Sequence, residues 1–239
     1  MILSHAHRFI FLKTTKTAGT SAEIALSRIC GQDDIITPIS PDDEMARAKA
    51  GGLSARNYLY PREARNPEQV IGIARGARAV QLANGTRAPL KFFNHMSARD
   101  LIAKVGADIW RDYFTFCIER NPWDRAVSHY YYRHAREPRP RFGAYLRSSA
   151  LLTLKRDGRE LYTLDGKVVV DRILRFESLK EDLREVFAHL GVDGEPELPK
   201  TKTSFRPERS AYRELYSEGD RTLIAELFRD EIELMGYRF

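Results

Sequence analysis

Two short stretches of the chain carry side chains that suit the binding of an anion. In the first, Lys13 and Lys16 lead into the small and hydroxyl-bearing run Thr17-Ala18-Gly19-Thr20-Ser21. A glycine lets the backbone approach a ligand closely, hydroxyl groups donate hydrogen bonds, and the lysine adds a full positive charge. We therefore predict that a phosphate-like anion is bound by Lys16, Thr17, Ala18, Gly19, Thr20 and Ser21.

The residues on either side place this loop at the start of a helix. Phe9-Ile10-Phe11-Leu12 is a short apolar run, aromatic and β-branched, as expected for a buried strand. A helical pattern begins at Ala22 and continues through Ile24 and Leu26. Free backbone N–H groups and the positive end of the helix dipole attract anions at a helix start. An ordinary strand–turn–helix unit with a solvated lysine is the alternative interpretation.

The second stretch, Arg120 to Ser128, repeats this arrangement. The β-like run Tyr113–Glu119 precedes it, and Pro122 is suited to the first turn of a helix. Arg120 is then at the tip of the strand, and Ser128 is nearly two turns into the helix. Ligands of α/β sheets bind at the carboxyl ends of the strands. Two such turns on nearby strands suit a nucleotide that carries phosphate at both ends.

The remaining pattern indicates an α/β protein. Lys91–Met96 is predicted to be a strand end that delivers His95 to a loop, and Ser97 is predicted to cap the next helix. Asp165-Gly166 marks a hairpin turn, and a last helix is predicted over Asp220–Leu234. Strands that alternate with helices favour parallel pairing in a central sheet.

Composition indicates a basic globular protein. The chain has 239 residues, 43% of them hydrophobic, with a net charge of +6 and a pI of about 9.3, which favours anionic partners. Cys30 and Cys117 are too few and too far apart for a metal cluster or a disulfide framework. No stretch approaches the apolar length of a membrane span, and the first apolar run is too short for a signal peptide. We expect a cytoplasmic protein of bacterial character, without stable membrane insertion.

The two anion-binding stretches together resemble one known family. The order from Lys16 to Ser21 resembles the 5′-phosphosulfate loop of sulfotransferases that use 3′-phosphoadenosine 5′-phosphosulfate (PAPS), although Thr15 stands where carbohydrate-type members have proline. Arg120-Asn121-Pro122, with Ser128 eight residues after the arginine, resembles the 3′-phosphate motif of the same family. Glu119 stands there in place of a common valine. The layout is similar to that of small bacterial carbohydrate-type members, with residues 41–90 matching least well.

The resemblance implies a P-loop-NTPase-like three-layer α/β fold, with a central parallel sheet flanked by helices. It implies a single sulfotransferase domain over residues 1–239, in which 31–90 and 137–170 are insertions on the acceptor side. The implied reaction moves a sulfuryl group from PAPS to an acceptor hydroxyl on a carbohydrate, glycolipid or small metabolite, leaving adenosine 3′,5′-bisphosphate (PAP). No metal is required.

The resemblance also implies a role for each site residue. Lys16 would stabilise the charge that develops on the departing 5′-phosphate, and Arg120 and Ser128 would bind the 3′-phosphate. The attacking hydroxyl needs a base, for which His95 is the best candidate; a structural histidine is the alternative. The basic segment Lys200–Arg206 either closes over the nucleotide or is a solvated loop.

Two other functional classes stay open on the sequence. A nucleotide kinase with a degenerate phosphate loop would need a magnesium-binding acid at a strand end, and the chain has no Walker A sequence to support it. A nucleic-acid-binding protein would interleave aromatic and basic residues, as Tyr130–Arg136 does, and its DNA binding would be sensitive to salt. Because that cluster follows Ser128 on the same predicted helix, we interpret it as scaffold or acceptor wall and expect no nucleic-acid partner.

Overall fold

The computed structural model describes residues 1–61, 70–73, 79–199 and 209–239. The strands are β1 Ile2–Ser4, β2 Phe9–Leu12, β3 Ile35–Ile36, β4 Val70–Ile73, β5 Ala79–Leu82, β6 Arg87–Pro89, β7 Phe114–Glu119, β8 Thr163–Leu164, β9 Lys167–Val168 and β10 Arg172–Arg175. The α-helices are α1 Gly19–Ser27, α2 Pro41–Lys49, α4 Ala98–Val105, α5 Ala107–Asp112, α6 Pro122–Arg133, α7 Phe142–Leu146, α8 Ser149–Arg156, α9 Leu179–His189, α10 Glu218–Leu227 and α11 Arg229–Met235. The 3-10 helices are η2 Arg159–Leu161, η3 Phe176–Ser178 and η5 Arg209–Leu215.

A five-stranded sheet with the order β10-β7-β2-β1-β3 forms the centre of the molecule. Strands β2 and β10 both pair with β7 in parallel, with Leu12 opposite Cys117 and Leu174 opposite Ile118. Strand β1 is antiparallel to both of its neighbours, so it runs against the other four. The expected α/β class is confirmed, while β1 makes the sheet mostly rather than wholly parallel.

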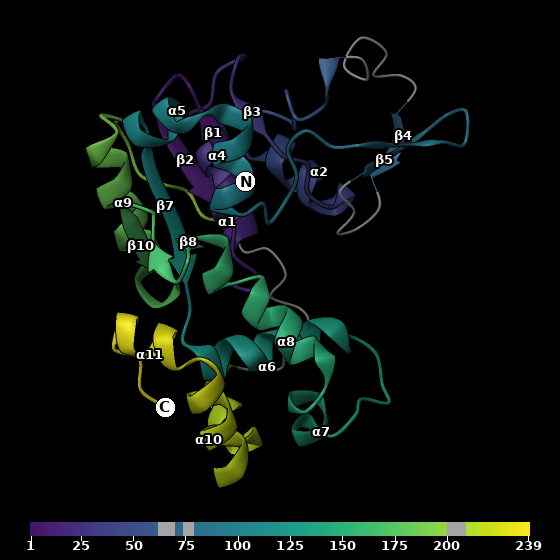
Figure 1. The fold of residues 1–239 in the computed structure, drawn as a ribbon, viewed down its shortest axis with the longest axis vertical. Coiled ribbons are helices and arrows are strands. Elements are labelled where there is room, and N and C mark those ends of the chain that lie inside the picture. Colours follow the sequence, from purple (N-terminus) through teal and green to yellow (C-terminus); the bar gives the residue numbers. More distant parts are fainter. Residues whose placement is uncertain (62–69, 74–78, 200–208) are drawn as a thin grey trace.

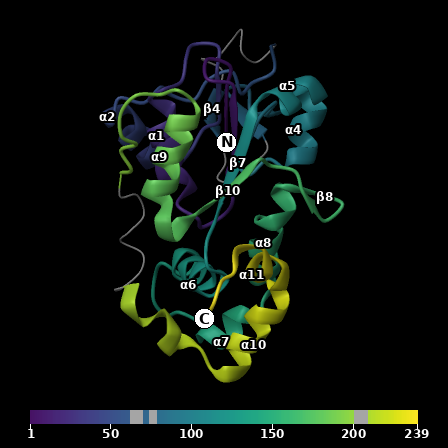
Figure 2. The same ribbon diagram turned by 90° about the vertical axis from the view of Figure 1, so that its left-hand side faces the viewer.

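Alternating side chains of β2 supply both cores of the sheet. Ile10 and Leu12 face the core that includes Leu101 of α4, whereas Phe9 and Phe11 face the core under α1 and α9. Figure 2 shows α1 and α9 on one side of the sheet and α4 and α5 on the other. The strand is buried on both faces, which explains its continuous apolar sequence. These contacts confirm the three expected layers.

A group of helices lies beyond the carboxyl ends of β2 and β7 (Figure 1). Its apolar core is formed by residues from α6, α7, α8, α10 and α11. Helix α6 begins at Pro122, as predicted, and Asn121 caps it by accepting a 3.1 Å hydrogen bond from the Trp123 N–H. None of the helices in the described ranges combines the length and apolar character needed to cross a membrane.

Two local predictions need correction, and one strand was not predicted. The run Lys91–Met96 is not a strand end, because it forms turns in which Phe92 and Met96 are buried against the sheet. The last helix is divided at Phe228 into α10 and α11. The short edge of the sheet, β1 and β3, includes a strand at residues 2–4 that the sequence did not indicate. The hairpin at Asp165-Gly166 and the helix capped by Ser97 are confirmed.

Candidate functional site

The predicted anion-binding loop connects β2 to α1. Helix α1 begins at Gly19, earlier than the predicted start at Ala22, so its first turn includes Thr20 and Ser21. Lys16 and Ala18 both have left-handed backbone conformations, with φ angles of 66° and 62°. Left-handed residues next to a residue of negative φ turn successive N–H groups toward one point, which is a concavity suited to an anion. The backbone of this loop therefore forms a concavity of the kind that can hold an anion.

Four consecutive carbonyl groups of this loop accept hydrogen bonds from side chains. In order from residue 13 to residue 16, the donor atoms are His95 Nδ1, Thr17 Oγ1, Arg125 Nε and Arg120 Nη1, at 2.8, 3.2, 2.8 and 3.2 Å. The C=O and N–H groups of a trans peptide point in opposite directions. The N–H groups of Lys16 and Thr17 consequently point away from the two arginines. Two arginines and a histidine from distant parts of the chain thus fix the shape of the loop.

Arg120 brings the second predicted turn against the first. Strands β2 and β7 are parallel neighbours, so the turns that follow them share one edge of the sheet. The Arg120 side chain is buried and donates from Nη1 to the Lys16 carbonyl oxygen at 3.2 Å. Its Nε donates to Asp124 Oδ2 at 2.8 Å, and its guanidinium lies 3.9 Å from the centre of the Phe176 ring. The structure therefore joins two cationic turns that are far apart in the sequence.

Ser128 lies on α6 with a half-buried side chain. One turn further along this helix, the Tyr132 ring centre is 4.3 Å from Lys16 Nζ. The aromatic cluster after Ser128 is divided in its roles, because Tyr130 is buried and donates to the Pro140 carbonyl oxygen at 2.8 Å. Tyr130 is therefore scaffold, whereas Tyr132 faces the anion-binding loop.

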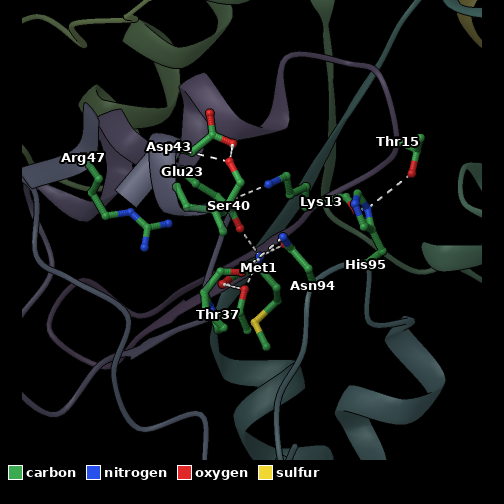
Figure 3. Close-up of polar contacts among 12 residues, drawn as sticks. Met1, Lys13, Thr15, Glu23, Thr37, Ser40, Asp43, Arg47, Asn94 and His95 are labelled. Carbon is green, nitrogen blue, oxygen red and sulfur yellow. Dashed lines mark hydrogen bonds and ion pairs between the residues drawn. The ribbon is translucent and has the colours of Figure 1, made fainter. Parts of the chain in front are cut away.

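His95 reaches the loop from a turn and has a left-handed φ of 56°. Its Nδ1 is 2.8 Å from the Lys13 carbonyl oxygen and 3.4 Å from Thr15 Oγ1 (Figure 3). A carbonyl oxygen can only accept, so Nδ1 carries the hydrogen and Nε2 is left as the basic nitrogen. Burial, followed by the charge of Lys13, lowers the pKa of His95 to about 3. The imidazole is therefore neutral near pH 7.

The two lysines of the loop differ in their surroundings. Lys13 is buried, and its Nζ donates to Glu23 Oε2 at 2.5 Å (Figure 3). Burial alone would raise the pKa of Glu23, but Lys13 and the Met1 amino group outweigh it and hold that pKa at about 2. A Cβ atom on Gly19 would lie 2.6 Å from Lys13 Cγ. Gly19 is therefore needed first of all to let the Lys13 side chain pass.

Sequence reasoning missed Glu23 and the contact of Arg125 with the loop. Glu23 is an acidic residue within the apolar face of a predicted helix, and this was the available signal. Arg125 lies inside the second motif, but nothing in the sequence connects it to Thr15, whose carbonyl it contacts. The basic segment Lys200–Arg206 lies outside the described residues.

Comparison with known proteins gives a relative in sequence and a similar solved structure. No protein-family model matches the chain. A mouse sulfotransferase, SULT7A1, crystallised as a complex with PAP, is similar with a TM-score of 0.47 and 15% identity, over 96% of this chain and 86% of its own. Similarity at this level carries no conclusion about activity. An uncharacterized protein of Archaeoglobus fulgidus is 32% identical over 95 residues, which are 38% of this chain and 79% of that protein. The chain belongs to the same family as this archaeal protein.

Proposed function

We propose that this protein is a PAPS-dependent sulfotransferase that moves a sulfuryl group to an acceptor hydroxyl. The observation that carries the proposal is the contact between Arg120 Nη1 and the Lys16 carbonyl oxygen, 3.2 Å apart. It brings the two motifs that resemble the family to one edge of the sheet. A nucleotide with anionic groups at both ends of its sugar matches two adjacent cationic turns better than a nucleotide with one phosphate chain.

In this proposal, the residues from Lys16 to Ser21 bind the 5′-phosphosulfate through backbone N–H groups, hydroxyl groups and the start of α1. Arg120 and Ser128 bind the 3′-phosphate. The bonds of Arg120 to the Lys16 carbonyl oxygen and to Asp124 come from Nη1, Nε and Nη2 of its guanidinium. They hold the plane of the guanidinium in a fixed orientation, which favours a bidentate contact with phosphate.

The proposed reaction is a direct displacement at sulfur. The acceptor oxygen forms a bond to sulfur while the bond from sulfur to the bridging oxygen breaks, and PAP leaves with an added negative charge. Lys16 stabilises this charge where it develops. His95 Nε2 takes the proton of the acceptor hydroxyl, and the bond from Nδ1 to the Lys13 carbonyl keeps the imidazole in the required tautomer.

We further propose one domain over residues 1–239, with a P-loop-NTPase-like order of strand, loop and helix at β2–α1. The acceptor would approach from the side of residues 31–90 and 137–170, and a carbohydrate or glycolipid is the proposed acceptor class. Tyr132 supports an acceptor that presents a hydroxyl-bearing ring, because its aromatic side chain lies beside Lys16 and offers a face for a ring to pack on.

Calorimetry with PAP and ATP tests the donor. We expect PAP to bind far more tightly, because ATP lacks a 3′-phosphate for the Arg120 turn. Lys16→Ala should weaken PAP binding and lower kcat, and mass spectrometry with a panel of hydroxyl acceptors would detect the sulfated product. Equal affinity for PAP and ATP would overturn the proposal.

A further inference from the structure

A fully buried arginine lies behind the anion-binding loop. Arg125 of α6 is 0% exposed, and its Nε donates to the Thr15 carbonyl oxygen at 2.8 Å. Its Nη2 is 3.2 Å from the carbonyl oxygens of both Leu154 and Asp157, and its Nη1 is 3.3 Å from Glu119 Oε2. One guanidinium thus connects the loop, the end of α8 and the end of β7.

The residue before Lys16 is held on both sides by this arrangement. The Thr15 N–H donates to the Asp157 carbonyl oxygen at 2.9 Å, and the Thr15 carbonyl accepts from Arg125. Since Asp157 itself accepts from Arg125, the three residues form a closed set of hydrogen bonds. Both polar groups of the Thr15 backbone are therefore fixed, which limits how the backbone enters the left-handed conformation of Lys16.

Glu119 supplies the charge that balances Arg125. Its side chain is 0% exposed, and Oε2 accepts from Arg125 Nη1 and from the Arg120 N–H, while Oε1 has no hydrogen-bond partner among the described residues. Burial raises the pKa of Glu119, while Arg125 opposes that shift. A buried guanidinium without a nearby carboxylate would be strongly unfavourable.

Gly158 closes the space around the guanidinium. A Cβ atom at this position would lie 2.6 Å from both Nη1 and Nη2 of Arg125. A side chain at position 158 would therefore collide with the guanidinium of Arg125.

We propose that Arg125, balanced by Glu119, is a positioning residue for the anion-binding loop. It sets the conformation of Thr15 and Lys16 so that the loop N–H groups and Lys16 meet the 5′-phosphosulfate, and it touches neither donor nor acceptor. This inference rests on the proposed function. It differs from a general stabilising role, because Arg125 should affect binding of the 5′ end of the nucleotide and leave binding of the 3′ end unchanged.

Calorimetry with three nucleotides separates these effects. The ratio of the Kd for adenosine 3′-monophosphate to the Kd for PAP measures the contribution of the 5′-phosphate. The ratio of the Kd for adenosine 5′-monophosphate to the Kd for PAP measures the contribution of the 3′-phosphate. In Arg125→Met, we expect the first ratio to fall about tenfold or more, as for a lost set of charge-assisted contacts. The second ratio should stay within about twofold, the scatter of independent sites.

Two further variants control for the cost of removing a buried charge. Arg47→Met also removes a 0% exposed arginine, but Arg47 pairs with Glu44 of α2, so both ratios should be unchanged. Gly158→Ala leaves Arg125 in place but displaces its guanidinium, and it should lower the first ratio in the same direction as Arg125→Met. It also serves as the test if Arg125→Met does not fold.

The outcomes distinguish this inference from the proposed function. If wild type shows no preference for PAP over either monophosphate, the proposed function and this inference are both overturned. If wild type prefers PAP and both Arg125→Met and Gly158→Ala keep the first ratio, the inference alone is overturned. If both Kd ratios fall equally in Arg125→Met, and they fall in Arg47→Met as well, the inference is also overturned, and Arg125 has a general structural role.

Discussion

The guanidinium of Arg120 donates a 3.2 Å hydrogen bond to the carbonyl oxygen of Lys16, which lies 104 residues earlier in the chain. The residues belong to the two turns that follow neighbouring parallel strands, β2 and β7. Arg120 also forms an ion pair with Asp124 in the first turn of α6. A substitution of Arg120 itself therefore reaches the anion-binding loop through one hydrogen bond.

Substitution of Arg120 by alanine should consequently weaken recognition of both ends of PAP. The loss of a charge-assisted contact to phosphate is worth about 1.5–3 kcal/mol, or about 10- to 150-fold in affinity for the 3′-phosphate. A smaller loss of affinity is expected for the 5′-phosphate, because the Lys16 carbonyl oxygen loses its hydrogen bond from Arg120. Calorimetry with PAP and the two adenosine monophosphates measures both contributions. Arg120→Lys should retain part of the affinity, and an unchanged preference for the 3′-phosphate in Arg120→Ala would contradict the assignment.

The strand–loop–helix units were predictable because their signals are local. Phe9–Leu12 is a continuous apolar run, and Pro122 favours a helix start through its own backbone geometry, without help from distant contacts. The alternation of strands and helices predicted parallel pairing in general. It did not predict which strands are adjacent, so the specific pairing of β2 with β7 came only from the structure. The antiparallel β1 has three residues, too short for a pattern to be recognised.

The differing surroundings of Lys13 and Lys16 could not be predicted in the same way. They depend on Glu23, which becomes a partner of Lys13 only after α1 packs against β2. The error at Lys91–Met96 has a similar origin. Phe92 and Met96 are buried because the turns pack on the sheet, and a short buried run has the same composition whether it is a strand or a turn.

Gly19→Ala tests whether this glycine is needed for the stability of the fold or only for ligand binding. The added Cβ would lie 2.6 Å from Lys13 Cγ, so the buried bond from Lys13 to Glu23 should be strained. We expect a loss of about 1–3 kcal/mol in the free energy of unfolding, typical of overpacking, even without nucleotide. Urea denaturation measures it. Gly219→Ala in α10 is the matched control, because nothing lies within 4 Å of its added Cβ and alanine favours a helix. An unfolding free energy unchanged by Gly19→Ala would show that Lys13 can move aside.

The pH dependence of turnover should reflect the lowered pKa of His95. The neutral imidazole is the active form, so kcat should be full above this pKa and fall below it. Because the pKa is about 3, His95 should contribute no change in kcat between pH 6 and 8 in the donor-free form of the site. His95→Ala should lower kcat by ~10²–10⁴, the scale for a lost general base, with PAP affinity near wild type. The exposed His5 supplies the control variant His5→Ala, and near-normal turnover of His95→Ala would make His95 structural.

The lowered pKa of His95 should also make the stability of the fold sensitive to acid. Between pH 6.5 and about 3 the unfolded chain binds a proton at His95 that the folded chain does not, so stability should fall as pH falls through this window. The expected loss is about 1–2 kcal/mol at pH 5 relative to pH 7. His95→Gln should remove this part of the pH dependence in urea denaturation at the two pH values. An equal loss in wild type and His95→Gln would contradict the shift.

The last prediction concerns the aromatic side chain beside Lys16. The Tyr132 ring centre is 4.3 Å from Lys16 Nζ, a distance at which a cation–π contact is worth about 0.5–2 kcal/mol. If the ring holds the ammonium toward the sulfuryl group, Tyr132→Leu should lower kcat by about 2- to 30-fold while Tyr132→Phe stays near wild type, because phenylalanine keeps the ring. Steady-state kinetics with PAPS and an active acceptor measure this.

Tyr131 provides the matched control for that experiment, since it is the adjacent tyrosine and its ring lies 5.1 Å from that of Tyr130. Tyr131→Leu should therefore leave kcat unchanged. A loss in Tyr132→Phe as large as that in Tyr132→Leu would assign the effect to the hydroxyl group. Wild-type kcat in Tyr132→Leu would show that Lys16 does not depend on the ring, and the orientation of its ammonium would then rest on the loop backbone that Arg120 and Arg125 hold.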